Sequence, residues 1–321
     1  MNKVVSKSLR LARRVINLGD NEPDGNMLNI DITGQGASDL IYRYLTDSAP
    51  CMIGRLGHSE FKVLRRYSIQ NNNTFINNLV GYMRGSHGPF WFDDVVRAEI
   101  HNFSGVFPND DSTLERFSEL YFRDMGELDV IGGWIKGEDE LSMYFPRAKV
   151  ISLGDIEPYY HANPWTRALE GKVVLVIHPF EATIRSQYKK RELLFESEYV
   201  LPEFELKTIK AVQSSRGSDT NHKDWFHALD SMTNQIANTD FDIAIIGAGA
   251  YGLPLAAHIK RMGKQSVHLG GATQILFGIR GARWDKNDFF KQLMNEHWVR
   301  PTDVETPKQY VGSNDKLSSY W

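Results

Sequence analysis

Short runs of Val and Ile alternate with longer helical patterns along most of this 321-residue chain. The runs that predict strands lie at residues 52–53, 130–134, 150–153, 173–177, 243–246 and 266–269. Residues 181–195, 225–236 and 253–262 have the spacing of amphipathic helices. Strands that alternate with helices are typical of βα units, in which the strands run parallel. The sequence therefore predicts an α/β fold with a largely parallel sheet.

Composition and turn residues predict three parts of the chain. The apolar content of 41%, with 12% aromatic residues, is sufficient for a packed core. Residues 1–26 are predicted to form a basic helix and a polar linker at 17–26, and residues 27–300 to form one domain. Residues 301–321 are predicted to be a tail whose aromatic side chains pack back onto that domain. A polar stretch at 214–222 predicts a mobile loop.

The charge balance argues against a nucleic-acid partner, because 37 basic and 40 acidic residues give a net charge of -3. The single cysteine, Cys51, excludes an intrachain disulfide and a multi-cysteine zinc site, and it favours a reducing compartment. Cys51 itself is predicted to be a small buried hydrophobe. No apolar run approaches the roughly 20 residues of a membrane span, and no signal-peptide pattern is present. We therefore expect a cytoplasmic protein.

The first fourteen residues, MNKVVSKSLRLARR, contain five basic residues and no acid. Val and Leu are interleaved with the basic residues, which predicts a partly amphipathic helix. A solvated terminal helix and a helix that lies on anionic lipid both fit this pattern. Under the second interpretation, residues 1–18 would make a peripheral contact with the inner face of the membrane.

Polar, glycine-rich segments follow five of the predicted strands. Ligands of open parallel sheets bind beyond the carboxyl ends of the strands, so these segments are the candidate site. The segments are RLGHSE at 55–60, Gly154 with Asp155, His178, GAGAYG at 247–252, and His268 with Gly270 and Gly271. Turns alone explain any one of them. Their joint occurrence, with Arg and His included, favours a ligand site.

The segment GAGAYG supplies Gly247, Gly249 and Gly252 and matches the dinucleotide fingerprint G-x-G-x-x-G. That fingerprint also requires an acid at the end of the next strand, where this chain has His268, Gly270 and no acid. NAD is therefore not predicted as a cofactor. Two interpretations of the glycines remain open. Their N–H groups bind a phosphate, or the glycines only permit tight packing of a helix on a strand.

Further cationic and polar side chains lie near these segments. Arg280 and Arg283 are candidates to neutralise a diphosphate, although each is also explained by a pair with a surface carboxylate. Gln274 is a candidate to bind a base or a sugar. His178 follows a buried strand and therefore needs a partner or a ligand. Arg185, on the following helix, is expected to reach the same cleft.

Three segments of the chain resemble the GT-D class of bacterial glycosyltransferases. They are RLGHSE, HPFEATIRSQYKKRELLF at 178–195, and FDIAIIGAGAYGLPLAAHIKRMGKQSVHLGGATQILFGIRGARW at 241–284. The likeness covers roughly residues 35–300. It is to sequences with an R-x-G-x-x-E motif, which Arg55, Gly57 and Glu60 match. The resemblance implies a single Rossmann-like domain with helices on both faces of the sheet, active in the synthesis of surface polysaccharide or another glycan.

The resemblance also implies a reaction, in which a sugar moves from a nucleotide-diphosphate donor to a hydroxyl of a glycan acceptor. Arg55 would then contact the donor phosphates and Gly57 would let the loop approach them. Glu60 would be a metal ligand or the base that takes the hydroxyl proton, with Asp155 as a second candidate base. The better-known branch holds a divalent metal with Asp-x-Glu, but here His58 replaces the Asp. The resemblance therefore leaves Mn²⁺ or Mg²⁺ binding by His58 and Glu60 open.

His178 and His268 are candidates for contacts with the diphosphate or the sugar. Two other functions remain open on the sequence. One is a non-catalytic scaffold of the same fold that binds nucleotide or glycan. The other is a different nucleotide-dependent Rossmann enzyme, for which the ribose-binding acid is missing.

Overall fold

A computed structural model describes residues 3–15, 25–215, 220–306 and 320–321 of the chain. Most of the predicted linker at 17–26, the centre of the predicted loop at 214–222 and most of the tail at 301–321 lie outside the described residues. The predictions for those segments stay predictions.

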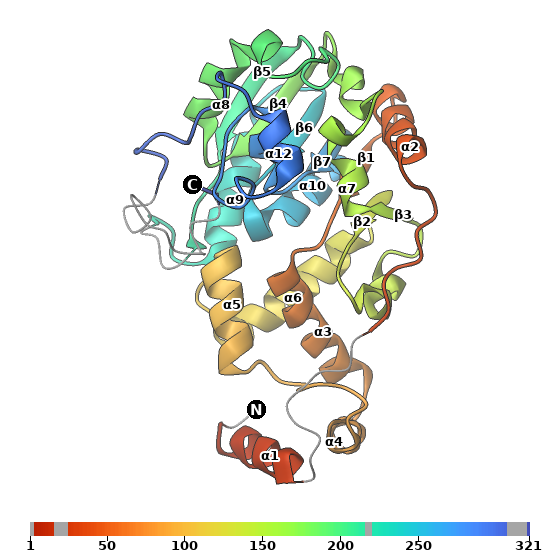
Figure 1. The fold of residues 1–321 in the computed structure, drawn as a ribbon. Helices are drawn as coiled ribbons and strands as arrows, with labels where there is room; N and C mark the ends of the chain where they lie inside the picture. The colour runs from red at the N-terminus through yellow and green to blue at the C-terminus, as the bar shows by residue number, and fades with distance from the viewer. Residues whose placement is uncertain (1–2, 16–24, 216–219, 307–319) are drawn as a thin grey trace.

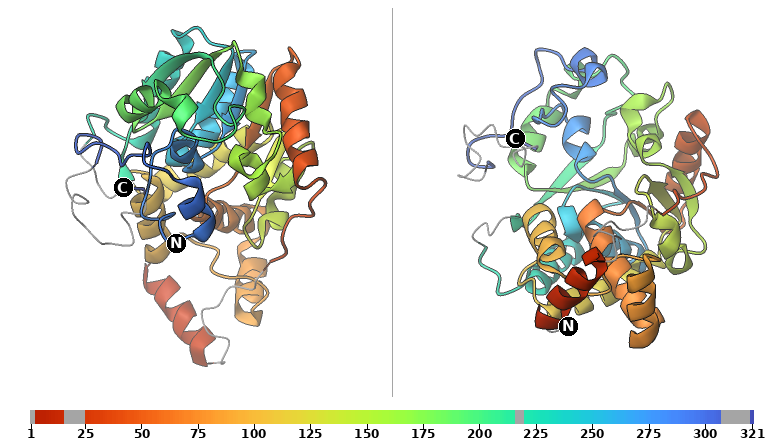
Figure 2. Two further views of the ribbon diagram at one scale, coloured as in Figure 1. Left: turned by 45° about the horizontal axis from the view of Figure 1, so that its top comes forward. Right: turned by 60° about the horizontal axis from the view of Figure 1, so that its bottom comes forward.

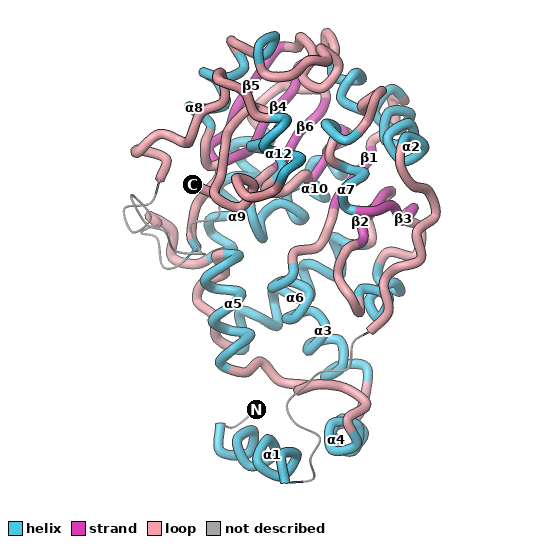
Figure 3. The backbone as a smooth tube through the Cα atoms, viewed as in Figure 1, coloured by secondary structure: helices cyan, strands magenta, loops and turns pink. Residues whose placement is uncertain are grey.

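Seven parallel strands form one open sheet in the described part of the chain (Figures 1 and 3), in the order β3-β2-β1-β7-β6-β4-β5. They are β1 (Cys51–Gly54), β2 (Val130–Gly133), β3 (Lys149–Ser152), β4 (Val173–His178), β5 (Glu205–Lys210), β6 (Ile243–Ile246) and β7 (Gln265–His268). Every pair of neighbouring strands is parallel. The predicted α/β fold with a parallel sheet is confirmed, and all six predicted strands are present.

Helices cover both faces of this sheet, because successive side chains of a strand point to opposite faces. In β4, Leu175 and Ile177 belong to one buried cluster, whereas Val174 and Val176 belong to another. The first cluster packs against α3 (His58–Asn72), α5 (Asp94–Ser104), α6 (Asp111–Met125), α9 (Trp225–Ala237) and α10 (Gly252–Arg261). The second packs against α2 (Gln35–Thr46), α7 (Leu153–Ile156), α8 (Glu181–Tyr188), α11 (Ala272–Leu276) and α12 (Asp288–Leu293). The predicted coverage of both faces is therefore confirmed.

Four helices lie between β1 and β2 in the chain, namely α3, α4 (Phe75–Arg84), α5 and α6. Thr74, Asp93 and Asp110 begin the last three by accepting backbone N–H groups of the first turn. Helix α3 begins differently, because its N-cap is Gly57, which has no side chain to accept those bonds. Helices α3 and α4 lie, together with α1 (Lys3–Val15), at the lower end of the molecule in Figure 1, away from the upper part of the sheet (Figures 1 and 2). Helix α1 confirms the predicted basic helix.

Helices α9 and α10 agree with their predicted ranges to within one residue. Helix α8 starts at Glu181 as predicted but ends at Tyr188 instead of continuing to residue 195. The chain leaves the helix there because Leu194 enters the core, where its carbonyl accepts the indole N–H of Trp298 at 3.0 Å. None of the described helices has the length and apolar character required to cross a membrane.

Candidate functional site

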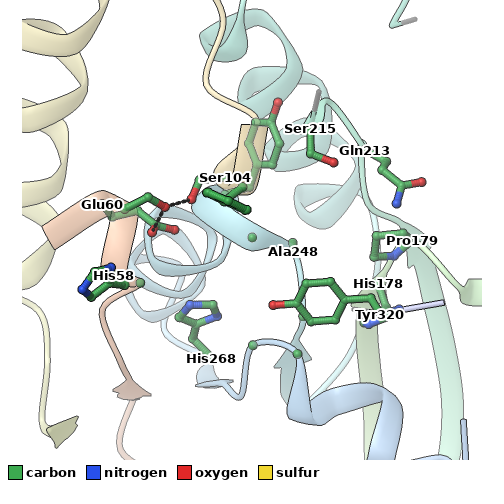
Figure 4. A pocket seen from close by; sticks show the side chains of 18 of the residues that line it. His58, Glu60, Ser104, His178, Pro179, Gln213, Ser215, Ala248, His268 and Tyr320 are labelled. Carbon is green, nitrogen blue, oxygen red and sulfur yellow. Dashed lines mark hydrogen bonds between the residues drawn. The ribbon is translucent and has the colours of Figure 1, made fainter. Parts of the chain in front are cut away.

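A cavity of about 370 Å³ lies beyond the carboxyl ends of β1, β7, β6 and β4 (Figure 4). Segments that follow these four strands line it, together with the start of α3, the end of α5 and the last two residues of the chain. Strand β1 has two neighbours in the sheet. The next strand along the chain, β2, lies on one side of β1, and β7 lies on the other side. The cavity is therefore at a switch point of strand order, where ligands of open α/β sheets bind, and its volume suits a small molecule.

Twelve of the residues predicted for the site line this cavity. They are Arg55, Gly57, His58, Glu60, His178, Gly247, Gly249, His268, Gly270, Gly271, Gln274 and Arg283. They come from segments up to 228 positions apart, the separation of Arg55 and Arg283. The structure brings these side chains and turns to one place, and what they bind there stays a prediction.

The remaining four predicted residues are not in the cavity lining. Asp155 lies on α7, where its carbonyl contacts the imidazole of His161. Arg185 is 56% exposed and pairs with Glu181, and Arg280 pairs with Asp285 at 3.5 Å. Gly252 lies under the ring of His268, whose Cε1 would be 2.0 Å from a Cβ at that position. Arg185 and Arg280 are thus each paired with a carboxylate of the protein. Gly252 is packed against the imidazole ring of His268.

The guanidinium of Arg55 lies over an aromatic ring that also lines the cavity. Its Cζ lies 5.0 Å from the centre of the Trp134 ring. Trp134 is fixed in turn, because its indole N–H donates to the Leu56 carbonyl at 2.9 Å and its backbone N–H donates to Glu138 Oε2 at 2.8 Å. Within the described residues Arg55 makes no hydrogen bond or ion pair. Its N–H donors therefore remain available for an anionic group that can accept two parallel hydrogen bonds, such as a phosphate.

The carboxylate of Glu60 belongs to a short chain of hydrogen bonds at the start of α3, beside the cavity. Glu60 is 5% exposed and lies in the first turn of α3. The Ser59 hydroxyl donates to Glu60 Oε2 at 3.1 Å, and it is 2.5 Å from the Ser104 hydroxyl, as the dashed lines in Figure 4 show. This chain orients one oxygen of the carboxylate, so that the group can accept a proton from a neighbouring hydroxyl.

Gly57 makes room for the Glu60 carboxylate, which is a different geometry from the predicted approach of the loop to a phosphate. A Cβ at residue 57 would lie 1.9 Å from Glu60 Oε2 and 2.3 Å from its Cδ. The Gly57 φ of −84° is open to any residue. The conflict is thus with the end of a side chain and not with the backbone.

We expect Gly57→Ala to fold but to displace the Glu60 carboxylate. The side chain of Glu60 can rotate away, so the free energy of unfolding should change by less than about 1 kcal/mol. Any activity that needs this carboxylate should fall by about tenfold or more, because misplaced groups lose most of their effect. Gly154→Ala is the matched control, since a Cβ at Gly154 meets no atom within 4 Å. Full activity in Gly57→Ala would show that the position of Glu60 does not matter.

Two buried histidines face the cavity as neutral rings. Burial lowers the pKa of His178 to about 3, and burial together with the Arg55 charge lowers the pKa of His268 to about 3. The Phe180 N–H donates to His178 Nδ1 at 3.0 Å, so the proton of this ring is on Nε2. His268 Nδ1 lies 3.4 Å from the Ile246 carbonyl, which can only accept, so its Nε2 carries a lone pair. One ring is therefore a donor at Nε2 and the other an acceptor.

The glycines of the two turns differ in what surrounds them. A Cβ on Gly247 would lie 2.5 Å from His178 Cδ2, and one on Gly252 would overlap His268, so both permit close packing. Gly249 and Gly270 have φ values of +52° and +66°, and a Cβ there would approach no atom closer than 3.7 Å. The packing interpretation fits the first pair. Of the second pair, Gly249 is exposed, whereas Gly270 is buried and its N–H already donates to the Ile246 carbonyl at 3.0 Å, so only Gly249 offers open backbone for a phosphate.

Two residues that the sequence analysis did not assign to the site are Tyr320 and Trp321, although both line the cavity. The Tyr320 ring points into it (Figure 4) and lies against Gly271, where a Cβ would be 2.5 Å from Cε1. Gln274 Nε2 donates to the Tyr320 carbonyl at 3.1 Å, and the Trp321 indole N–H donates to the Glu305 carbonyl at 3.2 Å. For these two residues, the predicted packing of tail aromatics onto the domain is confirmed.

A resident metal does not fit the donor set of this cavity. Within the described residues, no group of three or more His, Cys, Asp or Glu side chains is placed to hold an ion. His58 and Glu60 would supply only two ligands, and Glu60 Oε2 already accepts from Ser59. Glu99, the nearby carboxylate in the lining, is paired with Lys62 at 2.8 Å. We therefore assign no chemical step to a metal at this cavity.

Comparisons of the chain with protein-family models, with curated proteins and with solved structures found no match.

Proposed function

We propose that this protein is a glycosyltransferase of the GT-D type, which moves a sugar from a nucleotide-diphosphate donor to a hydroxyl of a glycan acceptor. The proposal includes a role in surface polysaccharide or other glycan synthesis in the cytoplasm. The observation that carries it is the presence, in one cavity at a switch point, of a buried carboxylate and a guanidinium that makes no hydrogen bond or ion pair with the described residues. Arg55 and Glu60 are those groups.

Negative charge accumulates on the nucleoside diphosphate as it leaves the sugar, and fixed donors aimed at that charge lower the barrier. Arg55 lies in the lining together with Arg283 and the exposed backbone of Gly249. The Nε2–H of His178, at the end of β4, adds a neutral donor in the lining. These groups are assigned to the diphosphate.

The acceptor hydroxyl must lose its proton when it attacks the anomeric carbon. Glu60 is the carboxylate assigned to this step, because Ser59 and Ser104 hold it in one orientation. His58 is exposed by surface area, but partial desolvation of its ring and the nearby Lys62 charge lower its pKa. A neutral His58 beside Glu60 is assigned to contact with the acceptor sugar.

Donor binding tests the proposal. UDP-, GDP-, TDP- and CMP-sugars are titrated calorimetrically into the full chain, with and without Mn²⁺. One donor is expected to bind, and Arg55→Gln should weaken it by about 10- to 100-fold, the effect of losing a charge-assisted bidentate contact. Arg185→Gln is the matched control, because Arg185 lies outside the cavity and pairs with Glu181.

Two outcomes would count against the transferase, and a third would change the roles of two residues. If no sugar nucleotide binds to the wild type while a glycan does, the non-catalytic scaffold becomes the better account. Equal losses of donor affinity in Arg55→Gln and Arg185→Gln would show that the donor does not bind in the cavity through Arg55. Binding that depends wholly on Mn²⁺ would assign His58 and Glu60 to the ion.

A further inference from the structure

Helix α1 packs on the body of the protein through one face only. Arg13 is 1% exposed, lies 4.5 Å from the centre of the Tyr82 ring, and donates to the His87 carbonyl at 3.1 Å. Arg10 pairs with Asp93 at 2.8 Å. Residues 9, 10 and 13 share one face of a helix with 3.6 residues per turn, and Leu9 packs on the cluster that contains Tyr82. This face fixes the helix on the protein.

The opposite face of α1 is apolar and basic. Leu11 is 65% exposed and Val15 is 75% exposed, although both are large apolar side chains. Helical spacing places Lys7 and Arg14 together along one border of the strip that Leu11 and Val15 form. The helix contains five basic residues, KVVSKSLRLARRV, and no acid, whereas the whole chain has a net charge of -3. Arg10 and Arg13 belong to the inner face, so the outer face combines exposed apolar groups with the positive charge of Lys7 and Arg14.

Helix α4 lies at the same end of the molecule as α1 (Figure 2, right), and it also carries exposed apolar side chains. Phe75 is 57% exposed and Ile76 is 70% exposed at its first turn, and Arg84 lies in its last turn. Of the large hydrophobic residues exposed in the described part of the chain, six lie on these two short helices: Val5, Leu11, Val15, Phe75, Ile76 and Val80. Such a concentration marks an interaction site more strongly than scattered apolar residues do.

We propose that the outer faces of α1 and α4, here called the α1–α4 surface, dock on an anionic lipid bilayer. Leu11, Val15, Phe75 and Ile76 enter the boundary between headgroups and acyl chains, and the basic residues lie beside the anionic headgroups. The excess of Lys and Arg in α1 favours a lipid partner, because charge attraction to anionic headgroups adds to the burial of apolar side chains. The proposal does not depend on the chemistry of the cavity.

Sedimentation of the full chain with vesicles tests this surface. Binding is expected to vesicles that contain phosphatidylglycerol, to be weak with phosphatidylcholine alone, and to fall as salt screens the charges. Leu11→Asp and Ile76→Asp should each lower the partition coefficient by about tenfold, since a charge replaces an inserted apolar group. Leu193→Asp is the control, because Leu193 is also exposed, at 51%, but lies on another part of the molecule. These point variants leave the buried contacts of Arg13 intact, which a deletion of α1 would not.

Two results would overturn the proposal. One is sedimentation of the wild type that does not depend on the anionic lipid. An equal decrease of sedimentation in Leu11→Asp and in Leu193→Asp would have the same meaning. The other is a dimer in gel filtration that Leu11→Asp dissociates while vesicle binding is absent, which would assign the surface to a second copy of the chain. Circular dichroism of each variant shows that the fold is retained.

Discussion

Glu60→Gln is expected to lower the rate of sugar transfer by about 10²- to 10⁴-fold while donor affinity stays within about twofold of the wild type. Gln has the shape of Glu, and its amide oxygen can still accept from the Ser59 hydroxyl. It cannot take a proton from the acceptor at neutral pH. The loss should therefore appear in kcat and not in the donor dissociation constant. Product formation with saturating donor, together with calorimetric titration of the donor, measures both.

Two variants serve as controls for Glu60→Gln. Asp155→Asn changes the second candidate base, which lies outside the cavity lining, and should retain most of the activity. Ser104→Ala removes the far member of the hydrogen-bond chain and should cost less than about tenfold, because Ser59 still contacts Glu60. A large loss in Asp155→Asn with an active Glu60→Gln would exchange the two roles. A loss confined to Mn²⁺-dependent donor binding would make Glu60 a metal ligand instead.

The sheet was predictable because its strands are buried on both faces and therefore consist of almost continuous Val and Ile runs. Strand β5 was missed, since its sequence ELKTIK carries Glu205, Lys207 and Lys210. It is the edge strand next to β4, and an edge strand tolerates charged side chains on its solvent side. The periodicity of local sequence also does not show that four helices separate β1 from β2, or where they pack.

The site was predictable only where local sequence carries the signal. Arg55, the glycine turns and the histidines follow strands, and the fold rule places strand ends together. Trp134 and Tyr320 were missed because their positions depend on contacts between distant segments. The acids at 138–140 predict a solvated helix start, but this is wrong for Glu138. Its carboxylate is fully buried, accepts the backbone N–H groups of Trp134 and Ile135, and so supports the ring under Arg55.

Acidification should destabilise the protein through its two neutral histidines. In the folded state the pKa of His178 and of His268 is about 3, compared with the usual value of 6.5. Below pH 6.5 the unfolded chain therefore binds protons that the folded chain excludes. Stability is fully present above that pH and falls as the pH decreases toward 3. At about 1.4 kcal/mol per pH unit for each ring, the pair removes about 5 kcal/mol by about pH 4.5.

Urea unfolding of the wild type and of the double variant His178→Gln/His268→Gln, at several pH values from about 7.5 to 4.5, isolates this effect. Other groups titrate in the same range, so the informative quantity is the difference between the two pH dependences and not either curve alone. The variant is expected to be less stable at pH 7.5 but to lose about 5 kcal/mol less on acidification. His297→Gln, a substitution of a histidine whose side chain is 37% exposed, is measured in parallel as the control for the His→Gln replacement itself. Parallel curves for the wild type and the double variant would mean that the two rings accept protons in the folded protein, and the tautomers assigned to the cavity would then be wrong.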